Sequence, residues 1–221
     1  MSELLSSFQL PSPESGELVR VELYQGVEDQ QIQFIESQWM PILKERQDRV
    51  IWNVKTKSIA DADERMSVFN RAMAIAGVPD GHWNWRQKIN SVGPEEAHAS
   101  FFVGIGNSVE AIMECRLLHF AREPSQVSQP IVYVNHVAVA PWNRTQIQNP
   151  RRIEKLGDLM MATAVSLSLE EGFGGRIGLH SLEQAEGFYQ CCGMSDLGPD
   201  EQYNGLRYFE FTGGQAAAFI S

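Results

Sequence analysis

The apolar residues of this chain switch repeatedly between the period-two spacing of a half-buried strand and the spacing of a helix face. Val19, Val21 and Leu23 alternate with Arg20 and Glu22, which is typical of a strand with one buried side. Strands are predicted at residues 18–24, 99–105, 109–118, 131–140, 176–179 and 206–212, the second and third joined as a hairpin, with a further apolar run at 216–220.

Helices are predicted where apolar residues recur every three or four positions. The first, residues 28–47, contains Pro41, which should kink or split it. The second, residues 61–76, opens with acidic side chains suited to the positive end of a helix and stops at Gly77. A long third helix is expected at residues 156–172.

Local sequence signals predict a last helix, and one segment is left without a predicted structure. Ser181 and Gln184 have the spacing of a capping box, which predicts a helix from there to Gly193. The aromatic-rich segment 81–88 is not assigned, and Gly93-Pro94 predicts a turn.

The chain is expected to hold one domain, residues 17–221, after a flexible N-terminal tail, residues 1–16. Its 43% hydrophobic content suffices for a single core, while the tail is rich in serine and proline. The chain shows neither a secretory signal nor a run of ~20 apolar residues, so it predicts a cytoplasmic protein without a membrane partner.

The amino-acid composition limits the classes of partner and the kinds of site that the chain is expected to have. A formal net charge of −10 argues against a nucleic-acid partner, which would need clustered cations, and favours a cationic substrate. The three cysteines show no disulfide framework and no Cys/His ligand spacing, so reduced thiols and no metal site are expected.

One loop stands out against this acidic background. Arg144, Arg151, Arg152 and Lys155 lie between a predicted strand and the N-terminus of the long helix. Free backbone N–H groups and the helix dipole favour an anion at such a point, and phosphate is the natural guest. The alternative is that these cations are solvated or paired with carboxylates.

The segment 131–194 resembles the GNAT (Gcn5-related N-acetyltransferase) superfamily. The resemblance rests on Val137-Ala138-Val139-Ala140-Pro141, on the basic loop with Leu156-Gly157-Asp158-Leu159-Met160, and on Phe188-Tyr189-Gln190-Cys191-Cys192-Gly193-Met194. It implies an α/β fold of the GNAT-like acyl-CoA N-acyltransferase type, whose central, mostly antiparallel sheet is splayed at the cofactor site and flanked by helices.

The resemblance also implies a site for acetyl-coenzyme A. Its pantetheine arm would pair with the strand backbone, and its pyrophosphate would lie on a loop that here has Lys155 in place of the family's first glycine. The residues assigned by this match are Val137, Ala138, Val139, Arg144, Arg152, Lys155, Leu156, Gly157, Asp158 and Ser181.

The same match assigns catalytic residues. Tyr189 stands where the family's tyrosine protonates the departing thiolate, although a core aromatic is the competing interpretation. The family's glutamate on strand 176–179 is missing, so the candidates for the base are His136, His180 or a relaying water.

Trp83 and Trp85 are candidates to hold the acceptor, a small-molecule or peptide amine, by their π-faces, although packing anchors are the competing interpretation. The sequence therefore predicts an N-acetyltransferase that transfers the acetyl group by direct attack of a primary amine. The alternative is a GNAT-like module that binds coenzyme A with weak or no turnover. A homodimer formed through the apolar run 209–220 is also left open.

Overall fold

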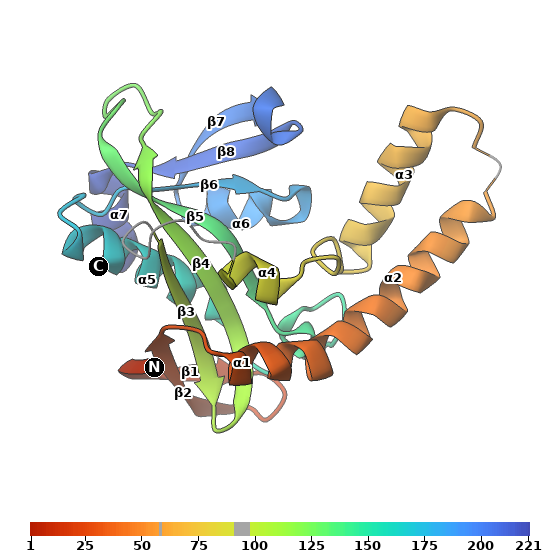
Figure 1. Ribbon diagram of the computed structural model, residues 1–221, viewed down its shortest axis with the longest axis horizontal. Helices are drawn as coiled ribbons and strands as arrows, with labels where there is room; N and C mark the ends of the chain where they lie inside the picture. Colours follow the sequence, from red (N-terminus) through yellow and green to blue (C-terminus); the bar gives the residue numbers. More distant parts are fainter. Residues whose placement is uncertain (58, 91–97) are drawn as a thin grey trace.

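The computed structural model describes residues 1–57, 59–90 and 98–221, so the predicted Gly93-Pro94 turn lies outside the described residues. Its centre is an eight-stranded sheet in the order β1-β2-β3-β4-β5-β6-β8-β7 (Figure 1). Neighbouring strands are antiparallel except β5 and β6, which run parallel. The strands are β1 (Glu3–Ser12), β2 (Glu17–Gln25), β3 (His98–Ile105), β4 (Ser108–Phe120), β5 (Pro130–Val139), β6 (Ile177–Ser181), β7 (Ser195–Asp200) and β8 (Leu206–Phe211).

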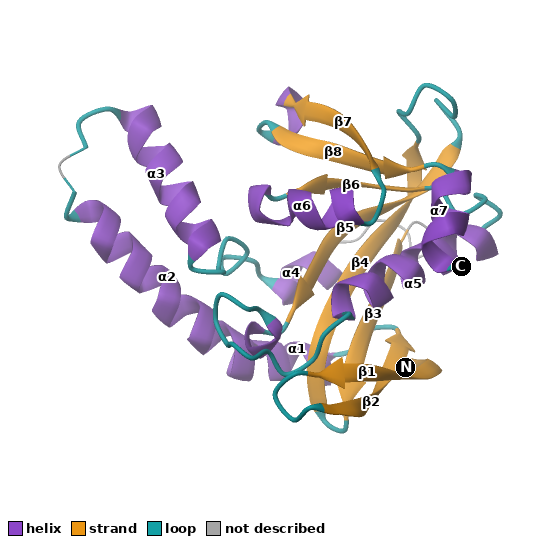
Figure 2. Ribbon diagram, turned by 180° about the vertical axis from the view of Figure 1, so that it is seen from behind, coloured by secondary structure: helices purple, strands orange, loops and turns teal. Residues whose placement is uncertain are grey.

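Helices cover both faces of this sheet (Figure 2). One face packs on α5, α6 and α7 through a core that includes Met160 and Phe209, and the opposite face packs on the N-terminal helices through a second core that includes Trp39 and Ile112. The predicted mixed α/β fold is therefore confirmed. The α-helices are α1 (Asp29–Phe34), α2 (Met40–Lys55), α3 (Ala62–Ile75), α4 (Trp85–Asn90), α5 (Leu156–Glu170), α6 (Glu186–Cys191) and α7 (Gly213–Ile220).

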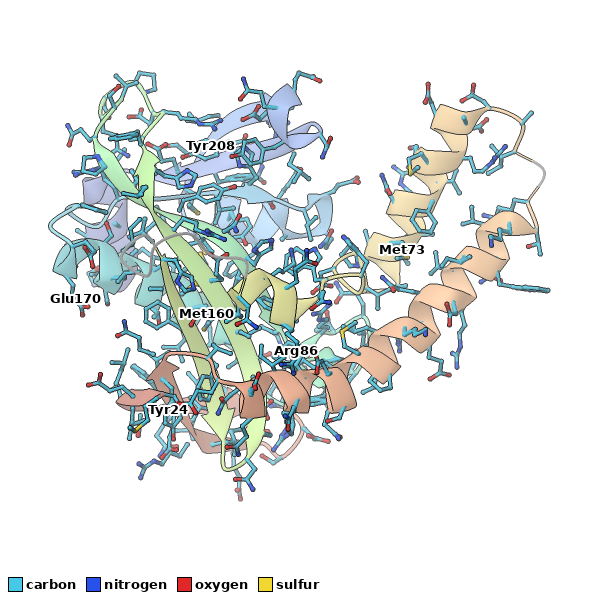
Figure 3. The ribbon with its side chains drawn as sticks, in the orientation of Figure 1. Tyr24, Met73, Arg86, Met160, Glu170 and Tyr208 are labelled. Atoms are coloured by element: carbon cyan, nitrogen blue, oxygen red, sulfur yellow. The ribbon has the colours of Figure 1, made fainter. Side chains whose placement is uncertain are left out.

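The N-terminal helices form an arm that projects from the sheet (Figure 1). A π-helical segment, Ile35–Trp39, joins α1 to α2, and Pro41, which has no backbone N–H to donate, follows this segment directly at the second residue of α2. The helical run is therefore not split at Pro41: it continues from residue 29 to residue 55, and the irregularity is the π-helical segment just before the proline. Arg86 of α4 pairs with Asp29 and Glu36 at 2.6 and 3.0 Å and holds α4 against the base of the arm (Figure 3).

The N-terminal segment is not the flexible tail that its composition predicts. Residues 3–12 form β1, which pairs with β2 from Glu3 opposite Gln25 to Ser12 opposite Glu17. The backbone ladder fixes this edge strand although most of its side chains are exposed. Pro11 is tolerated because an edge strand has one unpaired side.

The apolar C-terminal run packs inside its own chain. Phe209 and Phe211 of β8 are fully buried, and α7 begins with a capping box between Thr212 and Gln215 and buries Ala216. Ile220 at the other end of the run is 45% exposed, so the homodimer stays a prediction. Among the described residues, no helix has the length and apolar character needed to cross a membrane.

The sheet opens between β5 and β6. These strands are paired only at Val132 with Ile177 and at Tyr133 with Gly178, and beyond Tyr133 they diverge (Figure 2). One edge of β5 is left without a neighbouring strand from there to its end. This is the predicted splay of the sheet, and it positions the candidate site.

Candidate active site

The divergence of β5 and β6 leaves a cavity of about 470 Å³. Its wall includes the open part of β5, the C-terminal end of β6, α6 and the loop that follows α3. Of the residues that the sequence assigns to a site, the cavity brings together Trp83, His136, Val137, Ala138, Val139, Arg144, His180 and Tyr189.

At two of the three assigned positions the backbone of β5 faces the open edge, although the Val139 carbonyl there already accepts from Arg144. Ala140 N–H donates to the carbonyl of Glu110 on β4 at 2.9 Å. Because backbone groups alternate in direction along a strand, those of Val137 and Val139 point away from β4, toward the open edge. Ala138 points its backbone toward β4, so its assignment to cofactor pairing is wrong.

Arg144 anchors the site and is not a phosphate ligand. Its guanidinium makes a two-pronged ion pair with Asp80, with Nη2 2.7 Å from Oδ2, and the two side chains are only 10% and 9% exposed. Its remaining bonds go to the carbonyls of Val139, at 3.0 and 2.8 Å, and Gly77, at 2.9 Å. All five N–H groups are used, so the predicted phosphate role is corrected.

Arg152 is likewise drawn to a buried carboxylate. Its Nη1 lies 3.0 Å from Oε1 of Glu110, whose side chain is fully buried. Glu110 also accepts hydrogen bonds from Trp142 Nε1 at 2.7 Å and Asn143 Nδ2 at 2.8 Å, so it fixes the start of the loop. Arg152 keeps 37% of its side-chain exposure, but its charge is largely committed to Glu110.

The N-terminus of α5 retains features of an anion site. Lys155 has the left-handed backbone angle φ of 64°, the conformation that favours the glycine expected there, and its side chain is 63% exposed. Its Nζ lies 4.0 Å from Asp158. A Cβ atom on Gly157 would lie 3.0 Å from the ring of Phe188, so glycine permits the close approach of α5 and α6. Leu156 points into the core, and only its backbone is available.

Tyr189 lies on α6, almost fully buried, with its ring between Phe188 and Phe209 at centroid distances of 5.2 and 5.7 Å. Burial raises the pKa of its phenol well above the usual value, with a smaller contribution from Cys192. The hydroxyl therefore stays protonated through the physiological range. A protonated phenol on the wall of a cavity is suited to give a proton to a leaving group.

His136 is part of a charged cluster on the opposite wall. Its Nδ1 lies 3.1 Å from the fully buried carboxylate of Glu114, and its Nε2 faces the Lys88 ammonium. Burial lowers the pKa of His136 and also that of Lys88. Arg116 pairs with the second oxygen of Glu114. Both ring nitrogens of His136 are therefore engaged.

The two tryptophans have different roles. Trp83 lines the cavity, and Lys88 Nζ lies 4.6 Å from its ring centroid. Trp85 is 4% exposed and belongs to the N-terminal core, so its assignment to the acceptor is corrected to packing. Ser181 is also misassigned, because it ends β6, is 1% exposed and donates its hydroxyl to the Leu182 carbonyl rather than capping a helix.

Sequence reasoning missed the carboxylates that organise the site. Asp80 gives no signal beyond its turn-rich surroundings. Glu110 and Glu114 do, because they interrupt an apolar strand pattern, and a charge at a buried strand position needs a partner. Across the described ranges, no cluster of three or more His, Cys, Asp or Glu residues could hold a metal ion.

Comparison with known proteins gives fold relatives only. No family model matches the chain, and no curated protein matches it. Similar solved structures include a predicted acetyltransferase from Clostridium acetobutylicum with acetyl-CoA (11% identity, 80% of this chain and 90% of that one, TM-score 0.40). Others are a candidate GNAT-family acetyltransferase from Desulfovibrio desulfuricans (12%, 87% and 99%, 0.47) and a GCN5-related N-acetyltransferase from Ralstonia eutropha (16%, 79% and 92%, 0.41).

These structures are described as acetyltransferases, but all have identities below 20% and TM-scores below 0.5, so the assignment to the GNAT superfamily continues to rest on the sequence resemblance. At these identities the likeness extends to the course of the chain and not to substrates.

The prediction that excludes a nucleic-acid partner is wrong. Structures similar to this chain include the KacTA–DNA complex (18% identity, 57% of this chain and 75% of that one, TM-score 0.41) and the DNA-bound AtaT–AtaR complex (16%, 63% and 80%, 0.41). Proteins of similar fold thus occur in assemblies with DNA. An acidic net charge is a property of the whole chain and does not exclude such an assembly.

Proposed function

We propose that this protein is an acyl-CoA-dependent N-acyltransferase that transfers an acetyl group to a primary amine. The observation that carries the proposal is the cavity at the splay, which joins the outward-facing backbone of Val137 and the N–H of Val139 to the protonated phenol of Tyr189. A strand edge can form hydrogen bonds with an extended chain that contains amides. The phenol can donate a proton to the departing thiolate.

The residues at the splay fit acetyl-CoA in part. The backbone of Val137 would pair with the pantetheine arm, while the carbonyl of Val139 is already occupied by Arg144. The backbone N–H groups of Gly157 and Asp158, with the Lys155 side chain, would hold the pyrophosphate. When bound, acetyl-CoA supplies an acetyl group activated as a thioester.

The acceptor amine would enter from the wall that holds Trp83 and His136. The acidic net charge favours a cationic acceptor, while the Glu114 carboxylate already pairs with Arg116 and the Trp83 ring already carries Lys88 on its face. His136 as the base stays a prediction. With Lys88 against its Nε2, His136 could take a proton only after Lys88 moves away or is itself neutral.

Isothermal titration of acetyl-CoA into the protein, followed by a thiol-release assay with a panel of primary amines, tests the proposal. Lys155→Ala is expected to weaken acetyl-CoA binding about fivefold, since one charge-assisted contact contributes ~1 kcal/mol. Lys55→Ala, an exposed lysine on the distant arm, is the matched control. Tyr189→Phe should keep the affinity and lower turnover about 100-fold.

The outcomes separate the alternatives. Binding without turnover toward any amine would favour a coenzyme A-binding module. An absence of binding at millimolar acetyl-CoA would refute the acyltransferase proposal.

A further inference from the structure

A second chain of hydrogen-bonded groups reaches the same cavity. The Tyr133 hydroxyl lies 2.8 Å from His180 Nδ1, and His180 Nε2 lies 3.0 Å from Oδ2 of Asp200. The three residues come from β5, β6 and the end of β7. Tyr133 and His180 both line the cavity.

The arrangement is held on every side. Tyr133 is the last residue of β5 that pairs with β6, so its ring lies at the point where the strands part. The His180 side chain is 3% exposed, with the ring of Tyr203 stacked on it at 3.7 Å. The titratable and charged groups packed around Tyr133 and His180 are His119 on β4, Asp200 on β7, Tyr203 in the turn that follows and Tyr208 on β8, with Arg122 after β4 lying over the rings of Tyr203 and Tyr208.

Asp200 fixes the direction of the chain. Arg122 pairs with its carboxylate and Gln202 N–H donates to it at 2.9 Å, and the hydrogen bonds from Arg122 and His180 lower its pKa to about 2. An ionised carboxylate only accepts, so Nε2 of His180 carries the proton. Nδ1 is then an acceptor, and the Tyr133 hydroxyl donates to it.

We propose that Tyr133, His180 and Asp200 form the route by which a proton leaves the acceptor amine. The inference rests on the proposed acyltransferase function. The Tyr133 oxygen retains a lone pair that can accept from an ammonium in the cavity, because its own proton is directed to His180. Both ring nitrogens of His136, by contrast, are closed by Glu114 and Lys88.

The protons balance over one turnover. The ammonium gives one proton to the Tyr133 oxygen while the Tyr133 proton moves to Nδ1 of His180, which becomes an imidazolium beside the Asp200 carboxylate. The amine nitrogen then forms the C–N bond as the thioester C–S bond breaks, and the sulfur receives its proton from Tyr189. Tyr189, now a phenolate, takes the second proton of the attacking nitrogen and becomes a phenol again. His180 releases its proton to solvent.

The test uses the full chain and three variants. Tyr133→Phe removes only the hydroxyl, His180→Gln removes the titrating ring, and Asp200→Asn removes the charge. Tyr24→Phe is the matched control, because its hydroxyl bonds Glu22 on β2, away from the cavity. Acetyl-CoA affinity is measured for each variant by titration calorimetry. Turnover is then measured from pH 5 to 9 with whichever of butylamine, phenethylamine, spermidine or a lysine tetrapeptide the wild type acetylates best.

Tyr133→Phe and His180→Gln should lower kcat/KM about 100-fold while acetyl-CoA affinity stays within twofold. Asp200→Asn should lower it about tenfold and move the acid limb of the profile to lower pH, because Asp200 raises the pKa of His180 against the lowering caused by burial. Nitrogen-15 NMR of His180 should show protonated Nε2 and bare Nδ1 in the wild type, a measurement that needs no acceptor.

Two results would overturn the relay while leaving the acyltransferase in place. One is that Tyr133→Phe keeps the wild-type turnover and pH profile while His136→Gln loses turnover and the acid limb of its profile. The other is a proton on Nδ1 of His180. A wild-type protein that does not bind acetyl-CoA would instead remove the proposed function itself.

Discussion

Replacing Arg144 with methionine distinguishes an anchoring role from a phosphate-binding role. The substitution keeps most of the apolar length of the side chain and removes the guanidinium, which leaves the Asp80 carboxylate buried without its cation. It also leaves the carbonyls of Val139 and Gly77 without their donor. Removing one partner of a buried ion pair costs about 3–5 kcal/mol, because the remaining charge is uncompensated.

Urea unfolding followed by tryptophan fluorescence measures this cost. With a slope of about 2 kcal/mol per molar urea, the midpoint should fall by about 1.5–2.5 M. Arg151→Met is the matched control, since Arg151 pairs with Glu154 in the same loop but both side chains are about one-third exposed, at 36% and 35%. Its midpoint should fall by less than about 0.5 M.

A double variant isolates the electrostatic part. Arg144→Met with Asp80→Leu should recover a good share of the lost stability, because no buried charge then remains unpaired. If Arg144→Met instead unfolds like the wild type but binds acetyl-CoA at least tenfold more weakly, the anchoring argument fails and Arg144 is a cofactor ligand.

Two further predictions concern the phosphate loop and the buried histidines. Lys155→Gly should raise the free energy of unfolding by about 0.5–1 kcal/mol, because glycine relieves the left-handed backbone, and it should weaken acetyl-CoA binding through the lost charge; a melting temperature no higher than that of the wild type would contradict this. Burial lowers the pKa of three histidines in the folded chain, whereas the unfolded chain binds these protons near pH 6.5. The free energy of unfolding is therefore at its full value above that pH and decreases as the pH falls below it. Urea midpoints at pH 7.5, 6.5 and 5.5 should fall in that order, and a flat series would contradict the burial argument. The three histidines are His119, His136 and His180.

Elements with strong apolar periodicity were predictable, and polar edge elements were not. The hairpin of β3 and β4, the strand β5 and the helix α5 follow the sequence pattern closely, because each buries apolar side chains in a core. The strands β1 and β7 have no such pattern. They lie at the two edges of the sheet, where backbone pairing with one neighbour is enough to fix them.

The site shows the same division. Tyr189 and the strand residues Val137 and Val139 reach the cavity as the family resemblance implies. Arg144 and Arg152 were assigned to phosphate because their charge is visible in the sequence, whereas Asp80 and Glu110, which neutralise them, lie 64 and 42 positions earlier in the chain.

The sequence by itself determined the strands and helices that bury a regular apolar face and which residue types could carry chemistry, because periodicity and residue type are local properties. Only the tertiary structure decided which of those residues act together. Whether a cation meets a ligand or a buried carboxylate, and whether a histidine faces Lys88 or Tyr133, depends on contacts between distant segments. The splay of β5 from β6 sets those contacts at this site.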